Sequence, residues 1–136
     1  MRNNIFILFV VAVMLSSCMS DSFSNYINRL FLDDYKELFE KYDYIVLIPR
    51  SGCHACIEQA DYFFEEYKNN EKYLFVFTKL VSEKQLRIEL GSTNLLLKNV
   101  IVDTENDFYS PRFVELDYPL LLQKGSDEKL NYSYLN

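Results

Sequence analysis

Two cysteines, Cys53 and Cys56, carry the clearest chemistry in the sequence. Only His54 and Ala55 separate them, and this C-x-x-C spacing lets two thiols close into a disulfide and open again. A short apolar run, Tyr44 to Ile48, precedes the pair, and a segment with helical periodicity follows it. Cys53 is therefore expected at the amino end of a helix, where free N–H groups and the helix dipole favour a thiolate. The pattern predicts a thiol–disulfide redox site.

The positions around the pair predict a division of roles. Cys53 is the expected nucleophile, and Cys56, one turn inside the helix, is expected to be more buried and to resolve the mixed disulfide. His54, the single histidine, could stabilise the Cys53 thiolate as an imidazolium, or it could be an exposed side chain of little effect. Arg50 could add positive potential, although a solvated arginine in a turn is the more ordinary expectation. No cofactor is predicted beyond the redox-active Cys53–Cys56 pair itself.

Metal binding is an alternative use of the same side chains. Two thiolates and an imidazole are ligands for Cu(I) and Zn(II). Such a site would need a further histidine from a distant loop, and the sequence has only His54. No metal site is therefore predicted.

Composition restricts the class of protein. The 136 residues suffice for one domain, and hydrophobic residues make up 49% of them, which is enough for a sizeable core. The formal net charge is −6, and Lys and Arg do not cluster. An acidic surface repels phosphate backbones, so nucleic-acid binding is not expected.

The amino-terminal residues predict export and lipidation. Arg2 precedes an apolar run, Ile5 to Leu15, which is too short to span a membrane and suits the core of a signal peptide. The run ends in Leu-Ser-Ser-Cys, which resembles a bacterial lipobox, so residues 1–17 are expected to be removed and Cys18 to carry lipid. An ordinary signal peptide with a coincidental cysteine is the alternative. Residues 18–24 would then be a lipidated tether and residues 25–136 the folded domain.

Export would place the protein at the bacterial cell envelope, lipid-anchored and facing the periplasm, where disulfides persist. With Cys18 blocked by lipid, Cys53 and Cys56 would be the remaining thiols. The predicted partners are the thiols and disulfides of exported proteins, the membrane that holds the lipid, and a membrane electron donor.

Hydrophobic periodicity divides the domain into alternating helices and strands. Helices are predicted over Tyr26 to Tyr42, from Cys53 to about Asn69, and from Ser82 to Gly91. Strands are predicted over Tyr44 to Ile48, Tyr73 to Thr78, Asn99 to Asp103, Leu120 to Gln123, and Lys129 to Leu135. Strands that alternate with helices predict parallel pairing, and the last two strands predict a hairpin. The expected fold is an α/β sandwich with a central mixed sheet flanked by helices.

This arrangement resembles the thioredoxin fold, and more closely the TlpA/ResA-type membrane-tethered lipoproteins and their relatives in Bacteroidetes. The resemblance covers roughly Tyr42 to Tyr134, and residues 25–136 would be the thioredoxin-like domain. Two motifs carry it, Gly52 to Cys56 after one apolar strand and Tyr118-Pro119 before another. The resemblance implies that Pro119 is cis and lies against the C-x-x-C. It also implies that Tyr118 lines the site and offers backbone groups to an extended substrate.

The sequence departs from that family at three places. Gly52 stands where an aromatic residue usually precedes the first cysteine. The strand before the motif has no carboxylate to handle the proton of Cys56, so water or Glu58 would have to do so. The chain stops soon after the predicted edge strand, so the C-terminal helix of the fold is expected to be missing. The Tyr26 to Tyr42 helix could cover that face of the sheet instead.

The resemblance implies a thiol–disulfide oxidoreductase for exported proteins, with reduction as the expected direction. The departures favour an alternative, a non-catalytic lipoprotein in which the C-x-x-C is a closed disulfide. Such a module would bind a peptide or an envelope partner through its aromatic surface.

Overall fold

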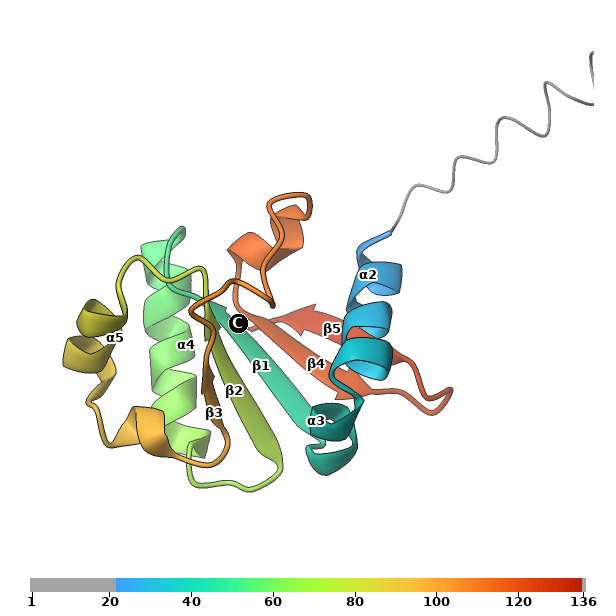
Figure 1. Cartoon of the computed structure of the whole chain (residues 1–136), viewed down its shortest axis with the longest axis horizontal. Coiled ribbons are helices and arrows are strands. Elements are labelled where there is room, and N and C mark those ends of the chain that lie inside the picture. The colour runs from blue at the N-terminus through green and yellow to red at the C-terminus, as the bar shows by residue number, and fades with distance from the viewer. Residues whose placement is uncertain (1–21, 136) are drawn as a thin grey trace, which may run out of the picture.

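A single mixed sheet forms the centre of the computed structural model, which describes residues 22–135 (Figure 1). Its five strands lie in the order β3-β2-β1-β4-β5. Their bounds are β1 Tyr44–Pro49, β2 Tyr73–Thr78, β3 Val100–Val102, β4 Leu120–Lys124 and β5 Leu130–Tyr134. β1, β2 and β3 are parallel, β4 is antiparallel to β1, and β4 and β5 form a hairpin. The predicted mixed sheet and its terminal hairpin are confirmed.

One face of the sheet is covered by α4, His54–Tyr67, and α5, Glu83–Leu90. The Oγ of Ser82 accepts a hydrogen bond from the N–H of Gln85, and Gly91, with φ of +82°, ends α5. The predicted start and stop of this helix are therefore confirmed. The side chains buried on this face are Val46, Ile48, Ala60, Phe64, Phe75, Phe77, Leu86, Leu90, Leu95 and Leu135.

The other face is covered by the amino-terminal helical segment, which is one of the possibilities that the sequence left open. Its parts are α2, Phe23–Arg29, a π-helical turn η1, Leu30–Asp34, and α3, Lys36–Lys41. The side chains buried here are Phe23, Ile27, Leu30, Phe31, Phe39, Tyr42, Ile45, Leu47, Leu74, Val76, Phe108, Phe113, Leu116, Leu120, Leu122 and Leu130. Within the described residues no helix follows β5, so this segment supplies the second layer.

The prediction of one continuous helix from Tyr26 to Tyr42 is wrong. The N–H of Tyr35 donates to the carbonyl of Leu30, which adds one residue to the turn. In a regular helix Leu38, seven residues after Phe31, would face the core. The wider turn instead buries Phe39 and leaves Leu38 half-buried. The larger aromatic side chain thus enters the core.

The central strands bury both faces because helices cover both sides. Residues 45–49 of β1 and 74–78 of β2 are all buried. Continuous apolar runs are typical of such parallel strands, and this explains why these two were visible in the sequence. None of the helices among residues 22–135 has the length and apolar character needed to cross a membrane. The predicted signal peptide and Cys18 lie outside the described residues.

Candidate redox site

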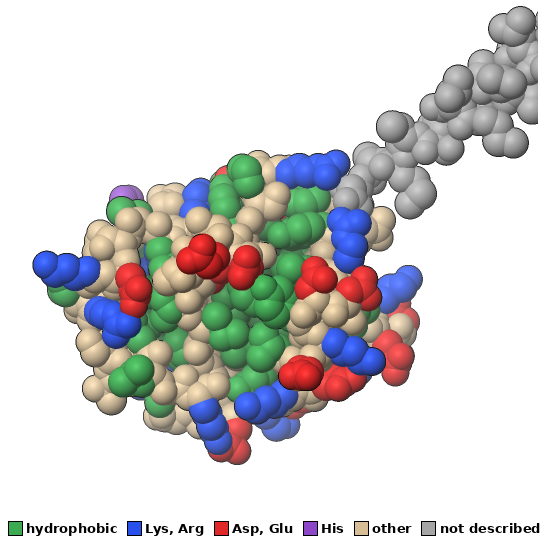
Figure 2. Space-filling view, viewed as in Figure 1, with side chains coloured by type: hydrophobic (Ala, Val, Ile, Leu, Met, Phe, Trp, Pro, Cys, Tyr) green, Lys and Arg blue, Asp and Glu red, His purple; other side chains and the backbone are tan. Residues whose placement is uncertain are grey.

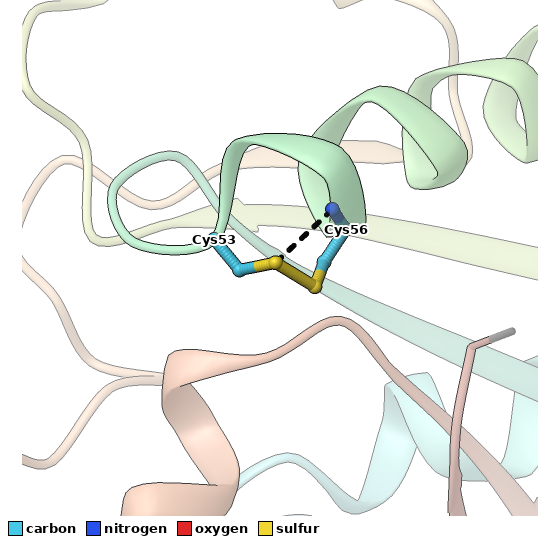
Figure 3. Close-up of a disulfide and its surroundings, with 2 residues drawn as sticks. All are labelled: Cys53 and Cys56. Carbon is cyan, nitrogen blue, oxygen red and sulfur yellow. Dashed lines mark hydrogen bonds between the residues drawn. A yellow bond between two sulfur atoms is a disulfide. The ribbon is translucent and has the colours of Figure 1, made fainter.

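The two cysteines form a disulfide at the start of α4 (Figure 3). Their Cα atoms are 5.3 Å apart. Cys53 is the N-cap residue of the helix, and its Sγ accepts a hydrogen bond from the N–H of Cys56 at 3.3 Å. A donor at the positive end of the helix therefore already points at this sulfur, where it would stabilise a thiolate after reduction.

The first turns of α4 carry side chains of different exposure. Cys53 and Cys56 are both half-buried. His54 and Glu58 are exposed on the first turns of α4. Among residues 22–135, no three His, Cys, Asp or Glu side chains gather in a way that could hold a metal ion.

A pocket of about 470 Å³ lies beside the disulfide. We call it the disulfide pocket, and its lining residues are Cys56, Tyr118, Pro119, Tyr134 and Leu135. The rings of Tyr118 and Tyr134 meet edge to face with centroids 5.8 Å apart. They remain 41% and 47% exposed, whereas Pro119 and Leu135 are buried. The structure thus brings Tyr118 and Pro119 next to the C-x-x-C and adds the end of β5, which the sequence reasoning missed.

The backbone around Pro119 differs from the expectation. All peptide bonds of residues 22–135 are trans, so the expected cis bond before Pro119 is wrong. Tyr118 is extended, with φ of −123° and ψ of 151°, which is the conformation favoured before a trans proline. The short 3-10 helix η3, Val114–Asp117, leads the chain directly into β4 in this conformation.

The backbone groups near the pocket are already bonded within the protein. The N–H of Tyr118 donates to the carbonyl of Glu115 at 3.2 Å. The carbonyl of Pro119 accepts a hydrogen bond from the N–H of Leu135 at 3.0 Å. A substrate strand could pair with the Tyr118 N–H only if its bond to Glu115 opened, because an N–H has a single hydrogen to donate.

Gly52 has a structural reason for standing before the first cysteine. Its φ is +133°, and a Cβ atom there would lie 3.2 Å from the backbone oxygen of Asp117. The turn between β1 and α4 thus packs closely against η3, and glycine permits both the conformation and the contact. The absence of an aromatic residue at this position follows from that contact.

Arg50 is not a solvated turn residue. Its side chain is 7% exposed, and its guanidinium donates two hydrogen bonds to Asp61 of α4 and one to Glu89 of α5. Burial acts to lower the pKa of Arg50, but the hydrogen bonds to the two carboxylates outweigh it and raise that pKa. The positive charge of Arg50 is therefore paired with carboxylates of α4 and α5. We call Arg50, Asp61 and Glu89 the Arg50 clamp.

A second charged cluster was not recognised in the sequence. Lys79, which follows β2 with φ of +51°, places its Nζ 2.7 Å from the carboxylate of Asp117. The same carboxylate oxygen accepts a hydrogen bond from the hydroxyl of Tyr109 at 3.1 Å. The hydrogen bond from Lys79 lowers the pKa of Asp117 and raises that of Lys79. We call these three residues the Lys79 clamp.

The Lys79 clamp adjoins the disulfide pocket. Asp117 ends η3, and Tyr118 follows it directly. The backbone oxygen of Asp117 faces Gly52, and the carboxylate of Asp117 binds Lys79. No local pattern links Lys79, Tyr109 and Asp117, because three separate segments contribute them.

Charges of both signs are interspersed over the face drawn in Figure 2, around a central apolar area, and that face has no continuous basic patch.

Comparisons with protein-family models, curated proteins and solved structures return no match for this chain. The Cys53–Cys56 pair on a mixed α/β sheet is compatible with a thioredoxin-like fold and with redox activity.

Proposed function

We propose that the protein is a lipid-anchored thiol–disulfide oxidoreductase of the thioredoxin-like, TlpA/ResA type, which reduces disulfides of exported proteins at the bacterial cell envelope. The observation that carries this proposal is the Cys53–Cys56 disulfide at the start of α4, beside an open pocket. A half-buried pair at a helix end can open and close without disturbing the core.

The exchange proceeds in two balanced steps. In the reduced protein, the Cys53 thiolate attacks one sulfur of a substrate disulfide, forms a mixed disulfide, and releases the first substrate thiolate. The Cys56 thiolate then attacks the Cys53 sulfur, closes the protein disulfide, and releases the second substrate thiolate. The substrate gains two electrons, and the two protons of the protein thiols end on the substrate thiols. A membrane-bound dithiol donor then reduces the protein again.

The hydrogen bond within the motif supports the choice of Cys53 as nucleophile. The N–H of Cys56 bonds to the sulfur of Cys53. The helix dipole adds about 0.3–1 kcal/mol of stabilisation for a negative charge at this position. The exposed His54 would add to this only when protonated.

The envelope location depends on the amino-terminal pattern of the sequence. Removal of residues 1–17 and lipidation of Cys18 would anchor the protein where disulfides persist. Metabolic labelling with a radioactive fatty acid in a bacterial host tests this part. We expect label on the wild type and none on Cys18→Ser.

Insulin reduction in the presence of dithiothreitol tests the redox function. We expect the wild-type chain to accelerate the reaction, Cys53→Ser to abolish the acceleration, and Cys56→Ser to accumulate mixed disulfide. Cys18→Ser is the matched control, because it makes the same replacement at the cysteine outside the pair. Equal rates for the wild type and Cys53→Ser would contradict the proposal.

The reduction potential of the pair tests the direction. A value of about −270 mV would support a reductase, and one of about −120 mV would make the protein an oxidant.

A further inference from the structure

We propose, on the basis of the redox function above, that the disulfide pocket binds an apolar side chain next to the reacting cysteine of an extended, basic substrate segment. The pocket would therefore set substrate preference through side chains rather than through backbone pairing.

The position of the pocket supports this assignment. It begins at Cys56 and extends over Tyr118 and Pro119 to Tyr134 and Leu135 at the end of β5. A substrate cysteine bonded to this site therefore places its neighbouring side chain within reach of the pocket. The exposed rings of Tyr118 and Tyr134 offer apolar area that such a side chain would cover.

The bonded backbone groups argue for recognition by side chains. The Tyr118 N–H and the Pro119 carbonyl both have partners within the chain. The Tyr118 N–H has one hydrogen to donate, so pairing it with a substrate would cost its present bond to Glu115. Burial of an apolar side chain carries no such cost, so it is the more favourable source of affinity.

The charge beside the pocket indicates the second part of the preference. Glu115 is half-buried in η3, and its carbonyl accepts a hydrogen bond at 3.2 Å from the N–H of Tyr118, a residue that lines the pocket. Asp117 is neutralised by Lys79, but Glu115 forms no ion pair with any described residue. With a net charge of −6 on the chain, a lysine or arginine in the substrate fits this carboxylate.

Three short peptides, each with one cysteine held as a mixed disulfide with glutathione, test the proposal on the full chain, with dithiothreitol as the reductant that restores the Cys53 and Cys56 thiols. The first reads Gly-Trp-Cys-Lys-Gly, the second replaces its tryptophan with serine, and the third replaces its lysine with glutamate. We expect kcat/KM for the first to exceed that of the second about tenfold, the scale for one apolar group in a pocket. A smaller preference, severalfold, is expected for the first over the third.

Variants assign the preference to the pocket. Tyr134→Ser should lower kcat/KM for the tryptophan peptide to that of the serine peptide, and Tyr134→Phe should retain the difference. Glu115→Gln should remove the preference for lysine over glutamate. Tyr62→Ser is the matched control, because Tyr62 is a 71% exposed tyrosine on α4 outside the pocket, and it should change nothing. Thermal unfolding would verify that each variant is folded.

A binding measurement separates the failure of this inference from the failure of the redox function. The protein has no tryptophan, so the emission of a peptide tryptophan reports on the peptide alone. A Gly-Trp-Ser-Lys-Gly peptide should shift to shorter wavelength with the oxidised wild type and not with Tyr134→Ser. Exchange with equal kcat/KM for the first two peptides would overturn the pocket assignment and leave the redox function standing. No exchange by the wild type would overturn the redox function, and an unshifted emission would then overturn the pocket assignment as well.

Discussion

Two basic residues follow the two central strands of the sheet and have different partners. Arg50 follows β1 and Lys79 follows β2, and the parallel register pairs Pro49 with Thr78 just before them. The Arg50 side chain is 7% exposed and binds carboxylates on α4 and α5. The Lys79 side chain is 26% exposed and binds Asp117 in the loop that forms the disulfide pocket.

This difference suggests that the two ion pairs have different roles. One stabilises the packing of helices on the sheet, and the other positions a loop beside the redox site. A buried cation with two carboxylates joins a strand to two helices, and removal of one partner leaves charges without compensation. A partly exposed ion pair in water contributes little to stability, but it can still hold a loop in one position. We therefore expect the Arg50 clamp to control stability and the Lys79 clamp to control exchange at the disulfide.

Loss of the Arg50 clamp should have the largest effect. Arg50→Ala should lower the free energy of unfolding by about 3 kcal/mol, the low end for a broken buried pair, because Asp61 and Glu89 are partly exposed. Denaturation with urea would measure the change. Arg50→Lys keeps one charge and should lose less. A loss below about 1 kcal/mol for the alanine variant would place the clamp with ordinary surface pairs.

Substitution of Gly52 should affect both stability and the site. Gly52→Ala should cost about 1–3 kcal/mol for the strained φ and should also displace η3 through the 3.2 Å contact with Asp117. Gly91→Ala is the matched control, because Gly91 also has a positive φ but its nearest neighbour would be 3.9 Å away. Both should lower the unfolding midpoint, and only Gly52→Ala should alter the insulin reduction rate. Unaltered reduction by Gly52→Ala would show that the contact does not position the loop.

Loss of the Lys79 clamp should have the opposite effect to loss of the Arg50 clamp, with a small change in stability and a larger change in exchange. Lys79→Met should change the free energy of unfolding by less than about 1 kcal/mol but lower kcat/KM for the tryptophan peptide severalfold, because the pocket wall loses its tie. Lys98→Met provides the comparison, since Lys98 pairs with Glu71 at the other end of the strands and should leave exchange unchanged. A stability loss as large as that of Arg50→Ala would erase the proposed distinction.

The smallest effect should be the pH dependence of the Lys79 clamp. Asp117 has a pKa below its ordinary value of 3.8, so its stabilising contribution is present above that value and is lost as pH falls through the lowered pKa. Lys79 has a raised pKa, so its contribution is complete below 10.5 and is lost as pH rises further. The stability difference between wild type and Asp117→Asn should therefore be constant from about pH 5 to 9 and disappear in strong acid. A difference that changes within the neutral range would contradict this assignment.

Local patterns predicted most of the elements. The strand from Tyr73 to Thr78 was predicted with its observed bounds, and Ser82 and Gly91 bracket α5 as expected. Buried parallel strands and helix ends have short-range signals, because residues adjacent in the chain produce them. The position of Cys53 at the start of α4 followed from the same kind of signal.

Features that depend on distant partners were not predictable. The π-helical turn at Leu30–Asp34 accompanies the burial of Phe39 in a core built from distant segments. The burial of Arg50 depends on carboxylates supplied by two helices. A single sequence window contains none of these partners.

The sequence by itself determined that two thiols stand at the start of a helix after a buried strand, because spacing and helix capping are local properties. Only the tertiary structure decided what faces those thiols. The sheet order brings Tyr118, which precedes β4, and Tyr134, which ends β5, to the side of Cys56. The same packing buries Arg50 while leaving Lys79 near the surface. Proximity across a sheet depends on strand order, and burial of a charge depends on the helices above it, so neither can be obtained from residues that are neighbours along the chain.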